Sequence, residues 1–221
     1  MSFDAEQRAY WTTQTNRRSA DHPVVRRFGE RRVRFINRLL ADRRPERLLE
    51  VGCGDGFGMQ HMAGLAGRLY GCDLSPAMLR ANPAPHERLI RADAYRLPFA
   101  AGSFDLVYCW ELLHHLADPG RAVAEMCRLS SGAVLICEPN ALKPAMALFG
   151  LLKQEERGLL RFTPGHTARL LAAAGLREVR SYAVDSFTPN RTPGWLAGLL
   201  GRLPYHLPVV GMYSIALGWR G

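Results

Sequence analysis

The sequence predicts an α/β fold built on a doubly wound, mostly parallel β-sheet. From residue 48 onward, short apolar runs alternate with helix-like patterns, as they do in repeated β-α-β units with right-handed crossovers. A glycine-rich segment, "VGCGDGFG", contains the end of the first run. Acidic residues stand at or after the ends of three runs. Because ligands of such sheets bind beyond the carboxyl ends of the strands, we expect the functional site there.

Length and composition are those of a soluble globular protein with one domain. The chain has 221 residues, of which 48% are hydrophobic and 22% are charged, which is enough to bury a substantial core. Its first residues lack the basic and apolar segments of a signal peptide, and no run reaches the length of about 18 apolar residues typical of a membrane span. We therefore expect a cytoplasmic protein.

Two helices, over residues 4–20 and 23–42, precede the first strand and are expected to form a cap. Apolar residues of the second recur at i, i+3 and i+4, which is typical of a helix with one buried face. Its arginines predict a solvated face opposite the apolar one: Arg27, Arg31, Arg34 and Arg38 against Val25, Phe28, Ile36 and Leu39. The formal net charge of +9 comes almost wholly from arginine. Such a charge also suits nucleic-acid binding, but the helical spacing favours a solvated face.

Strands and helices alternate through the middle of the chain. The predicted strands are residues 48–51, 69–72, 89–91, 104–109 and 133–137, and the predicted helices are 57–66, 76–81 and 119–128. Ser75 followed by Pro76 is a typical helix start, because serine caps the free amides and proline suits the first position.

The pattern changes after residue 139. Helices are expected over 141–152 and 164–174, a strand over 177–184, and a short helix before a last strand over 212–217. The proline-rich residues 186–208 are typical of a lid or docking loop.

The five cysteines are Cys53, Cys72, Cys109, Cys127 and Cys137, and none forms a C-x-x-C pair. We expect structural roles for them, because free cysteine behaves as a small buried hydrophobe in a reducing compartment. Cys109 lies near the expected site.

The spacing of the glycines indicates which ligand they bind. The dinucleotide fingerprint needs a third glycine at position 57, where this chain has Phe57, and no Gly-Lys-Ser/Thr follows to bind a triphosphate. What remains is an acid, Glu50, followed by Gly52, Gly54 and Gly56. An adenosyl group with an amino-acid tail fits this pattern.

Two further acids support an adenosyl ligand. Asp73 ends the second strand, where a carboxylate can accept hydrogen bonds from both ribose hydroxyls. Asp93 follows the third strand by a similar interval, where the adenine amino group could donate. The alternative for Asp73 is a helix N-cap, and for Asp93 an isolated surface acid.

Four motifs in order, "LLEVGCGDGFG", "LYGCDLSPAML", "RADAYRLPFAAGSFDLVYCWELLHHLADP" and "RAVAEMCRL", resemble the class I S-adenosylmethionine-dependent methyltransferases. The resemblance is to their small-molecule branch and covers about residues 45–139. It implies a Rossmann-like, seven-stranded sheet of order 3-2-1-4-5-7-6 with strand 7 antiparallel. It also implies one domain over 1–221, divided into a helical cap (1–45), a cofactor-binding half (46–140) and a substrate-side half (141–221).

The resemblance implies S-adenosyl-L-methionine as cofactor and names the residues that would bind it. Those residues are Glu50, Gly52, Cys53, Gly54, Asp73, Leu74, Asp93, Ala94 and Trp110. Trp110 either borders the adenosine or only packs in the core.

The resemblance implies that the segment "WELLHHLADP", just after the fourth strand, faces the transferred methyl group. Because histidine commonly titrates near neutral pH, His114 or His115 could act as general base for a hydroxyl acceptor. We favour His114 over His115, and the alternative is that neither acts as a base. Glu138 could orient a histidine or bind a substrate cation, unless it is an ordinary strand-end acid. Tyr10 and Trp11 are candidate wall aromatics. We predict no metal site, because adjacent histidines are expected to point in different directions.

The preferred function is methyl transfer to oxygen, with nitrogen or carbon as alternatives. The apolar tail over 195–217 suggests a small or lipid-like acceptor and contact with a membrane surface. A nucleic-acid methyltransferase is the second hypothesis, but "CWEL" stands where base-amine enzymes carry an Asn/Asp-Pro-Pro-aromatic tetrad, so we expect no nucleic-acid partner. A third hypothesis is that the chain is a noncatalytic protein that binds the cofactor without transferring its methyl group.

Overall fold

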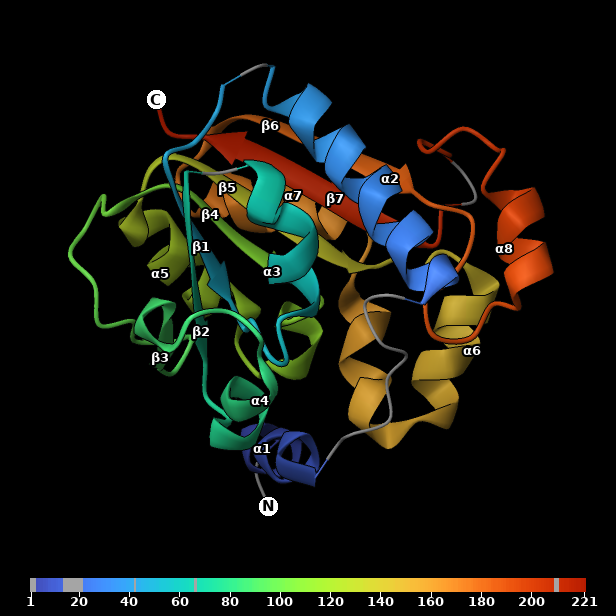
Figure 1. Cartoon of the computed structure of the whole chain (residues 1–221), viewed down its shortest axis with the longest axis horizontal. Coiled ribbons are helices and arrows are strands. Elements are labelled where there is room, and N and C mark those ends of the chain that lie inside the picture. Colours follow the sequence, from blue (N-terminus) through green and yellow to red (C-terminus); the bar gives the residue numbers. More distant parts are fainter. Residues whose placement is uncertain (1–2, 14–21, 42, 66, 209–210) are drawn as a thin grey trace.

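The computed structural model describes residues 3–13, 22–41, 43–65, 67–208 and 211–221. Its centre is one seven-stranded sheet of order β3-β2-β1-β4-β5-β7-β6 (Figure 1). The strands are β1 (Arg47–Val51), β2 (Arg68–Asp73), β3 (Leu89–Arg91), β4 (Phe104–Trp110), β5 (Ser130–Pro139), β6 (Arg177–Val184) and β7 (Tyr213–Trp219). Only β7 runs antiparallel to its neighbours. The predicted order and the antiparallel strand are confirmed.

Helices cover both faces of this sheet. They are α1 (Phe3–Thr13), α2 (Pro23–Leu39), α3 (Phe57–Met62), α4 (Pro76–Ala81), α5 (Pro119–Leu129), α6 (Pro144–Leu152), α7 (Pro164–Ala173) and α8 (Gly194–Leu200). Short 3₁₀ segments are η1 (Ala63–Leu65), η2 (His86–Arg88), η3 (Leu113–His115) and η4 (Gln154–Arg161). The part of the first predicted helix over residues 14–20 lies outside the described residues.

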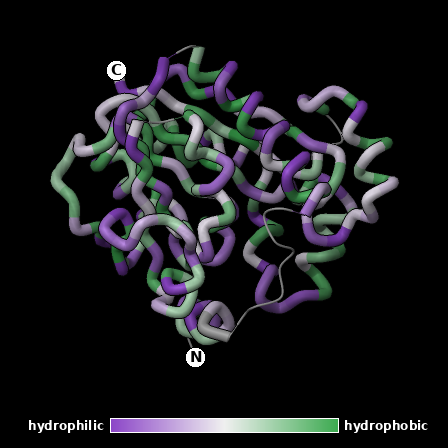
Figure 2. Tube along the Cα trace, viewed as in Figure 1, coloured by the Kyte–Doolittle hydropathy of each residue, from purple (hydrophilic) through white to green (hydrophobic). Residues whose placement is uncertain are grey.

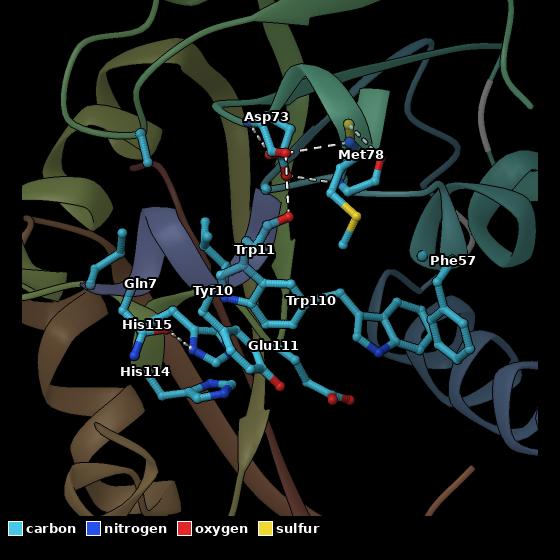
Figure 3. Close-up of a pocket in the computed structure, with 18 of the residues that line it drawn as sticks. Gln7, Tyr10, Trp11, Phe57, Asp73, Met78, Trp110, Glu111, His114 and His115 are labelled. Atoms are coloured by element: carbon cyan, nitrogen blue, oxygen red, sulfur yellow. Dashed lines mark hydrogen bonds between the residues drawn. The ribbon is translucent and has the colours of Figure 1, made fainter. Parts of the chain in front are cut away.

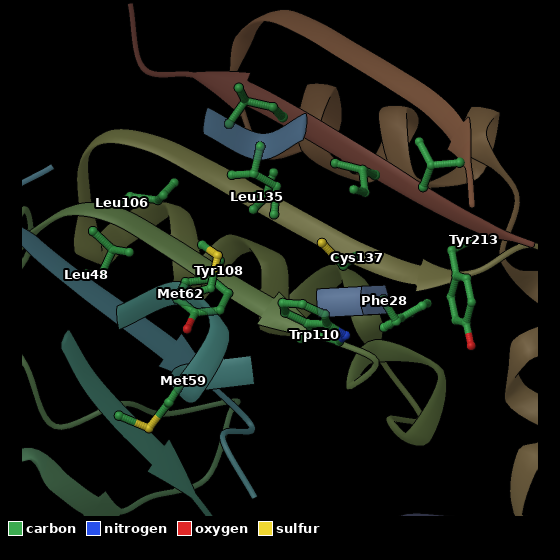
Figure 4. Packing of buried hydrophobic residues seen from close by; sticks show 14 of the residues in the cluster. Phe28, Leu48, Met59, Met62, Leu106, Tyr108, Trp110, Leu135, Cys137 and Tyr213 are labelled. Atoms are coloured by element: carbon green, nitrogen blue, oxygen red, sulfur yellow. The ribbon is translucent and has the colours of Figure 1, made fainter. Parts of the chain in front are cut away.

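The hydrophobic core has two layers because successive strand residues point to opposite faces. Leu48 and Leu106 pack with α2 and α3 in one cluster (Figure 4). Their neighbours Leu49 and Val107 pack with α5 and α7 in the other. The central strands are therefore apolar on both faces, as expected of a parallel sheet covered on both sides.

Predicted boundaries agree best where a helix has a clear start signal. The Ser75 hydroxyl accepts from the backbone N–H of Met78 at 3.4 Å, and α4 begins at Pro76 as predicted. The helix expected from residue 141 begins instead at Pro144. The reason is a local turn, in which the side-chain oxygen of Asn140 accepts from the N–H of Leu142 at 3.1 Å.

The prediction of a solvated arginine face on α2 is wrong at Arg31. That side chain is buried and donates to the carbonyl oxygens of Gly201 and Leu203. Arg32, beside it, is fully buried. Figure 2 shows hydrophilic residues alternating with hydrophobic ones along α2, but the loop after α8 covers part of the polar face. Among the described residues, no helix is both long and apolar enough to cross a membrane.

Candidate active site

A cavity of about 1070 Å³ opens at the carboxyl ends of the strands, where the sequence places the site. Figure 3 shows side chains from α1, β4 and the segments after β1 and β2 converging on it. Eleven of the twelve residues predicted for the site line this cavity: Glu50, Gly52, Cys53, Gly54, Asp73, Leu74, Asp93, Ala94, Trp110, His114 and His115. Glu138 lies behind the wall and is fully buried.

The turn between β1 and α3 has glycine at three positions with positive φ. Gly52, Gly54 and Gly56 have φ of 73°, 48° and 85°, in the left-handed region that other residues seldom adopt. Among the described residues, a Cβ at Gly54 would contact only the Met78 methyl, at 3.9 Å. The Gly54 backbone is therefore open toward the cavity, and a ligand can approach it closely.

Asp73 links the glycine turn to the following helix. One carboxylate oxygen accepts from the N–H of Gly54 at 2.9 Å and the other from the N–H of Ser75 at 2.8 Å. Burial raises the pKa of Asp73, while these backbone hydrogen bonds oppose that effect. Because a carboxylate oxygen has further lone pairs, both oxygens can still accept from a ligand.

Glu50 lies under the turn and is 1% exposed. Its carboxyl group is 2.7 Å from the hydroxyl of Tyr108 and fills the space where a side chain at position 58 would stand, so Gly58 is needed for packing. Burial raises the pKa of Glu50 to about 8. In the protein without ligand this acid is therefore largely protonated at neutral pH.

Asp93 and Ala94 lie at the part of the wall formed after β3. One oxygen of Asp93 accepts from the N–H of Tyr95 at 3.0 Å, and the other is 3.3 Å from the guanidinium of Arg8 in α1. The cap helix therefore closes over this side of the cavity.

Trp110 both lines the cavity and packs in the core. Its indole is 5.7 Å from the ring of Phe57 and lies 4.4 Å from the guanidinium carbon of Arg32 (Figure 3 shows the tryptophan beside Phe57). Arg32 is also 3.4 Å from a carboxylate oxygen of Glu111. Glu111 has a φ of 58°, a strained conformation that often marks a functional site.

His114 is held between two carboxylates. Its Nδ1 is 2.5 Å from Glu138 and its Nε2 is 3.3 Å from Glu156. Burial acts to lower the pKa of His114, but the two carboxylates outweigh that effect and raise it to about 10. Because this imidazole is already protonated at neutral pH, the arrangement argues against His114 as the general base.

His115 has a different neighbourhood. Its Nδ1 is 2.9 Å from the side-chain oxygen of Gln7, and its ring is 4.9 Å from that of Trp11. The amide nitrogen of Gln7 donates to the carbonyl oxygen of Glu155 at 2.8 Å, which fixes the orientation of the amide. Gln7 therefore accepts the Nδ1 proton of His115, and Nε2 carries the lone pair.

Glu138 organises the turn that carries both histidines. One of its oxygens accepts from the N–H groups of Leu112 and Leu113 at 3.0 and 2.7 Å, and the other faces His114. It is a positioning residue for η3, since it does not reach the cavity.

The reason for predicting no metal site does not hold. In the 3₁₀ turn the rings of His114 and His115 lie 3.9 Å apart, centre to centre, instead of diverging. Gln7 and Glu156, which contact them, were missed by sequence reasoning. Gln7 is 108 residues from His115 in the chain, and η4, which carries Glu156, was not predicted.

Comparison with known proteins identifies the domain type. Residues 49–137 match a family described as Methyltransferase domain. The chain is 27% identical over 206 residues to a probable chloroplastic tocopherol O-methyltransferase of Oryza sativa subsp. japonica, covering 81% of this chain and 54% of that protein. It is 31% identical over 150 residues to a ubiquinone biosynthesis O-methyltransferase of Thiobacillus denitrificans, covering 59% of this chain and 64% of that one.

A solved structure shares the fold. It is the magnesium protoporphyrin IX methyltransferase of Synechocystis with bound SAH, which covers 100% of both chains at a TM-score of 0.65 and 15% identity. The chain spans between half and two thirds of the length of the two curated relatives.

Proposed function

The chain belongs to the class I S-adenosylmethionine-dependent methyltransferases, and from that premise we propose that it methylates an oxygen atom of a small or lipid-like metabolite. One observation carries the proposal: a single cavity wall contains the acid-flanked glycine turn, Asp73 and the oriented imidazole of His115. The first two suit the cofactor, and the third suits an acceptor hydroxyl.

The wall near the glycine turn fits S-adenosylmethionine better than a phosphate-bearing ligand. Asp55 and Asp73 both border the cavity there. Ionised carboxylates repel phosphate and attract the ammonium and sulfonium charges of S-adenosylmethionine. Gly54 provides open backbone for close contact.

We assign the cofactor's parts to this wall in the order of the strands. Glu50, Gly52, Cys53 and Gly54 would contact the methionine and ribose, Asp73 and Leu74 the ribose, and Asp93 and Ala94 the adenine. Trp110 would border the sulfur side of the adenosine.

S-adenosylmethionine supplies an electrophilic methyl group on a positively charged sulfur. The chain's task is to align the acceptor and to exclude water. Helix α1 serves the second purpose, because it is fastened across the cavity by Arg8 to Asp93 and by Asp4, which accepts from the N–H of Ala117 at 2.8 Å.

His115 is the better candidate for the base. Gln7 sets its tautomer so that Nε2 can accept the acceptor's proton, whereas His114 already carries one. Glu138 and Glu156 hold His114 and with it the turn that positions His115.

The side of the cavity formed by α6 has apolar side chains and lies near an apolar surface. Met146 and Phe149 of α6 line it, together with the charged Lys153, Glu156 and Arg191. Outside, five large apolar residues of α6 and α8 are exposed: Leu148, Leu151, Leu152, Trp195 and Leu199. We name these five the α6–α8 surface. Their position beside the cavity favours a lipid-like acceptor reached from a membrane.

Two measurements test this function. Calorimetry with the folded protein is expected to show binding of S-adenosylmethionine and S-adenosylhomocysteine, and failure to bind either would end the proposal. Labelled methyl groups are then expected to pass to apolar phenols or alcohols and not to matched amines.

His115→Ala is expected to lower kcat by 10²–10⁴-fold, the usual contribution of a general base. It should also remove the acidic limb of the pH–rate profile while S-adenosylhomocysteine still binds. An unchanged rate and pH profile would remove His115 from the mechanism.

A further inference from the structure

His114, His115 and Glu156 form a cluster that the methyl-transfer scheme uses only in part. One nitrogen from each imidazole and one oxygen of Glu156 all lie within 4.8 Å of one another. All three residues line the cavity. Two imidazoles and one carboxylate make a common ligand set for Zn²⁺ and related divalent transition metals.

Each histidine in this cluster is oriented as a metal ligand is. Histidines that bind metals nearly always direct their other ring nitrogen to a carboxylate or carbonyl oxygen, which fixes the tautomer and the ring plane. Here Nδ1 of His114 faces Glu138 at 2.5 Å, and Nδ1 of His115 faces the Gln7 oxygen at 2.9 Å. Nε2 of His114 is 3.3 Å from an oxygen of Glu156, so a cation bound here would displace the proton that His114 holds between its two carboxylates.

The third group comes from a separate segment that is packed firmly in place. Segment η4 contacts η3 closely at Gly158, where any side chain would overlap the carbonyl oxygen of His114. Phe162, after η4, is fully buried. The carboxylate of Glu156 is thus delivered by a well-packed element, and a site held by rigid elements keeps its ligand geometry.

We propose that His114, His115 and Glu156 bind one divalent transition-metal cation of the Zn²⁺ type, with its remaining coordination positions open to the cavity. This inference rests on the proposed function, since the open positions face the space assigned to the acceptor. Three protein ligands with an open position are typical of catalytic zinc sites, whereas structural sites use four.

A cation here would replace His115 as the means of activating the acceptor. An acceptor hydroxyl that coordinates the cation has a lowered pKa and loses its proton to solvent. Its oxygen then forms the new bond to the methyl carbon as the carbon–sulfur bond breaks. The sulfur keeps that electron pair and becomes a neutral thioether, so charge and atoms balance with one proton released.

Metal binding to the full chain, stripped with a chelator, tests the site without relying on activity. Titration calorimetry with Zn²⁺, Co²⁺ and Mn²⁺ is expected to show one equivalent bound, and Co²⁺ should give the visible absorption of a low-symmetry nitrogen–oxygen site. His115→Ala and Glu156→Gln should each weaken binding by at least 100-fold. Gln7→Ala should weaken it by about 10-fold, as loss of an orienting partner does.

The matched controls are Glu155→Gln and His166→Ala, which change the same residue types outside the cluster and should bind metal normally. Circular dichroism and thermal melting confirm that each variant is folded. No bound metal in the wild type, or equal binding in Glu156→Gln and the wild type, would overturn the proposal. If the stripped protein binds S-adenosylhomocysteine but no metal, only the metal site fails; if it binds neither, the proposed function fails too.

Discussion

Glu50 is the residue whose protonation state the fold controls most directly. Its carboxyl group is buried beside Tyr108, and burial raises its pKa from 4.5 to about 8. An acid with a raised folded-state pKa binds more protons when folded than when unfolded. Its contribution to stability is therefore fully present below pH 4.5 and is lost as the pH rises through about 8.

Glu50→Gln removes this titration and keeps the shape of the side chain. We expect the free energy of unfolding of the variant, relative to the wild type, to increase between pH 5 and 8, by at most about 1.4 kcal/mol per pH unit. Urea unfolding of both proteins at a series of pH values measures the difference. A difference that is constant with pH would contradict the raised pKa. Glu46→Gln, an exposed change before β1, is the control.

Several single residues of the site could be predicted from the sequence because their roles are local. Asp73 and Gly54 lie at a strand end and in a turn, which spacing along the chain reveals. His115 was found as well, but its partner Gln7 was not, since the contact joins residues 108 positions apart. The protonated state of His114 likewise depends on Glu156, which comes from a distant segment.

At the scale of elements, the turn between β1 and α3 can be tested separately from the fold. Gly54→Ala places a methyl group in open space beside the cavity at a φ of 48°. The left-handed conformation costs about 1–2 kcal/mol, which the protein should tolerate. We expect affinity for S-adenosylhomocysteine to fall at least 10-fold, because the methyl group stands where the cofactor would contact the backbone.

Gly64→Ala is the matched control, since a Cβ there meets no atom of the described residues within 4 Å and its φ is not in the left-handed region. Calorimetry measures binding and thermal melting measures stability. Unaltered affinity in Gly54→Ala would place the cofactor away from this turn.

The prediction of elements succeeded where apolar periodicity and capping residues act together, as in α4 and the central strands. It failed where contacts between distant segments, and not the local sequence, determine which residues are buried. Segment η4 has two glutamates and two arginines among its eight residues, and its polar composition gives little sign that Leu159 is fully buried. Arg31 donates hydrogen bonds to carbonyl oxygens of a distant segment and can therefore be buried. Helical spacing alone placed it on the exposed face of α2, which is wrong.

For the whole molecule, the net charge of +9 overstates the free positive surface. Arg32 is fully buried against aromatic rings. Arg128 pairs with Glu125 at 2.8 Å, and Arg220 donates to the carbonyl oxygens of Cys127 and Ser130. Because part of the charge is used inside the fold, the charge by itself does not indicate nucleic-acid binding.

The α6–α8 surface is a stronger indication of a partner. Trp195 is 74% exposed and Leu152 is 73% exposed, and large apolar side chains exposed to this extent are candidates for an interaction surface. The guanidinium of Arg191 lies 4.5 Å from the ring of Phe149, which joins α6 to the segment before α8. Lys153 is exposed at the end of α6. Apolar groups with cations near them suit the surface of an anionic membrane.

We therefore expect the protein to sediment with vesicles that contain anionic lipid, and Leu152→Glu combined with Trp195→Glu to reduce that binding at least 10-fold. Each large apolar side chain that enters the membrane contributes about 1.5–3 kcal/mol, and each added carboxylate is repelled by the lipid headgroups.

Asn37→Glu combined with Gln60→Glu makes the same change of charge at exposed positions of α2 and α3 and should leave binding nearly unchanged. Both double variants should bind S-adenosylhomocysteine as the wild type does, because none of the four residues lines the cavity. Equal losses in the two variants would show that net charge, and not the α6–α8 surface, governs the association.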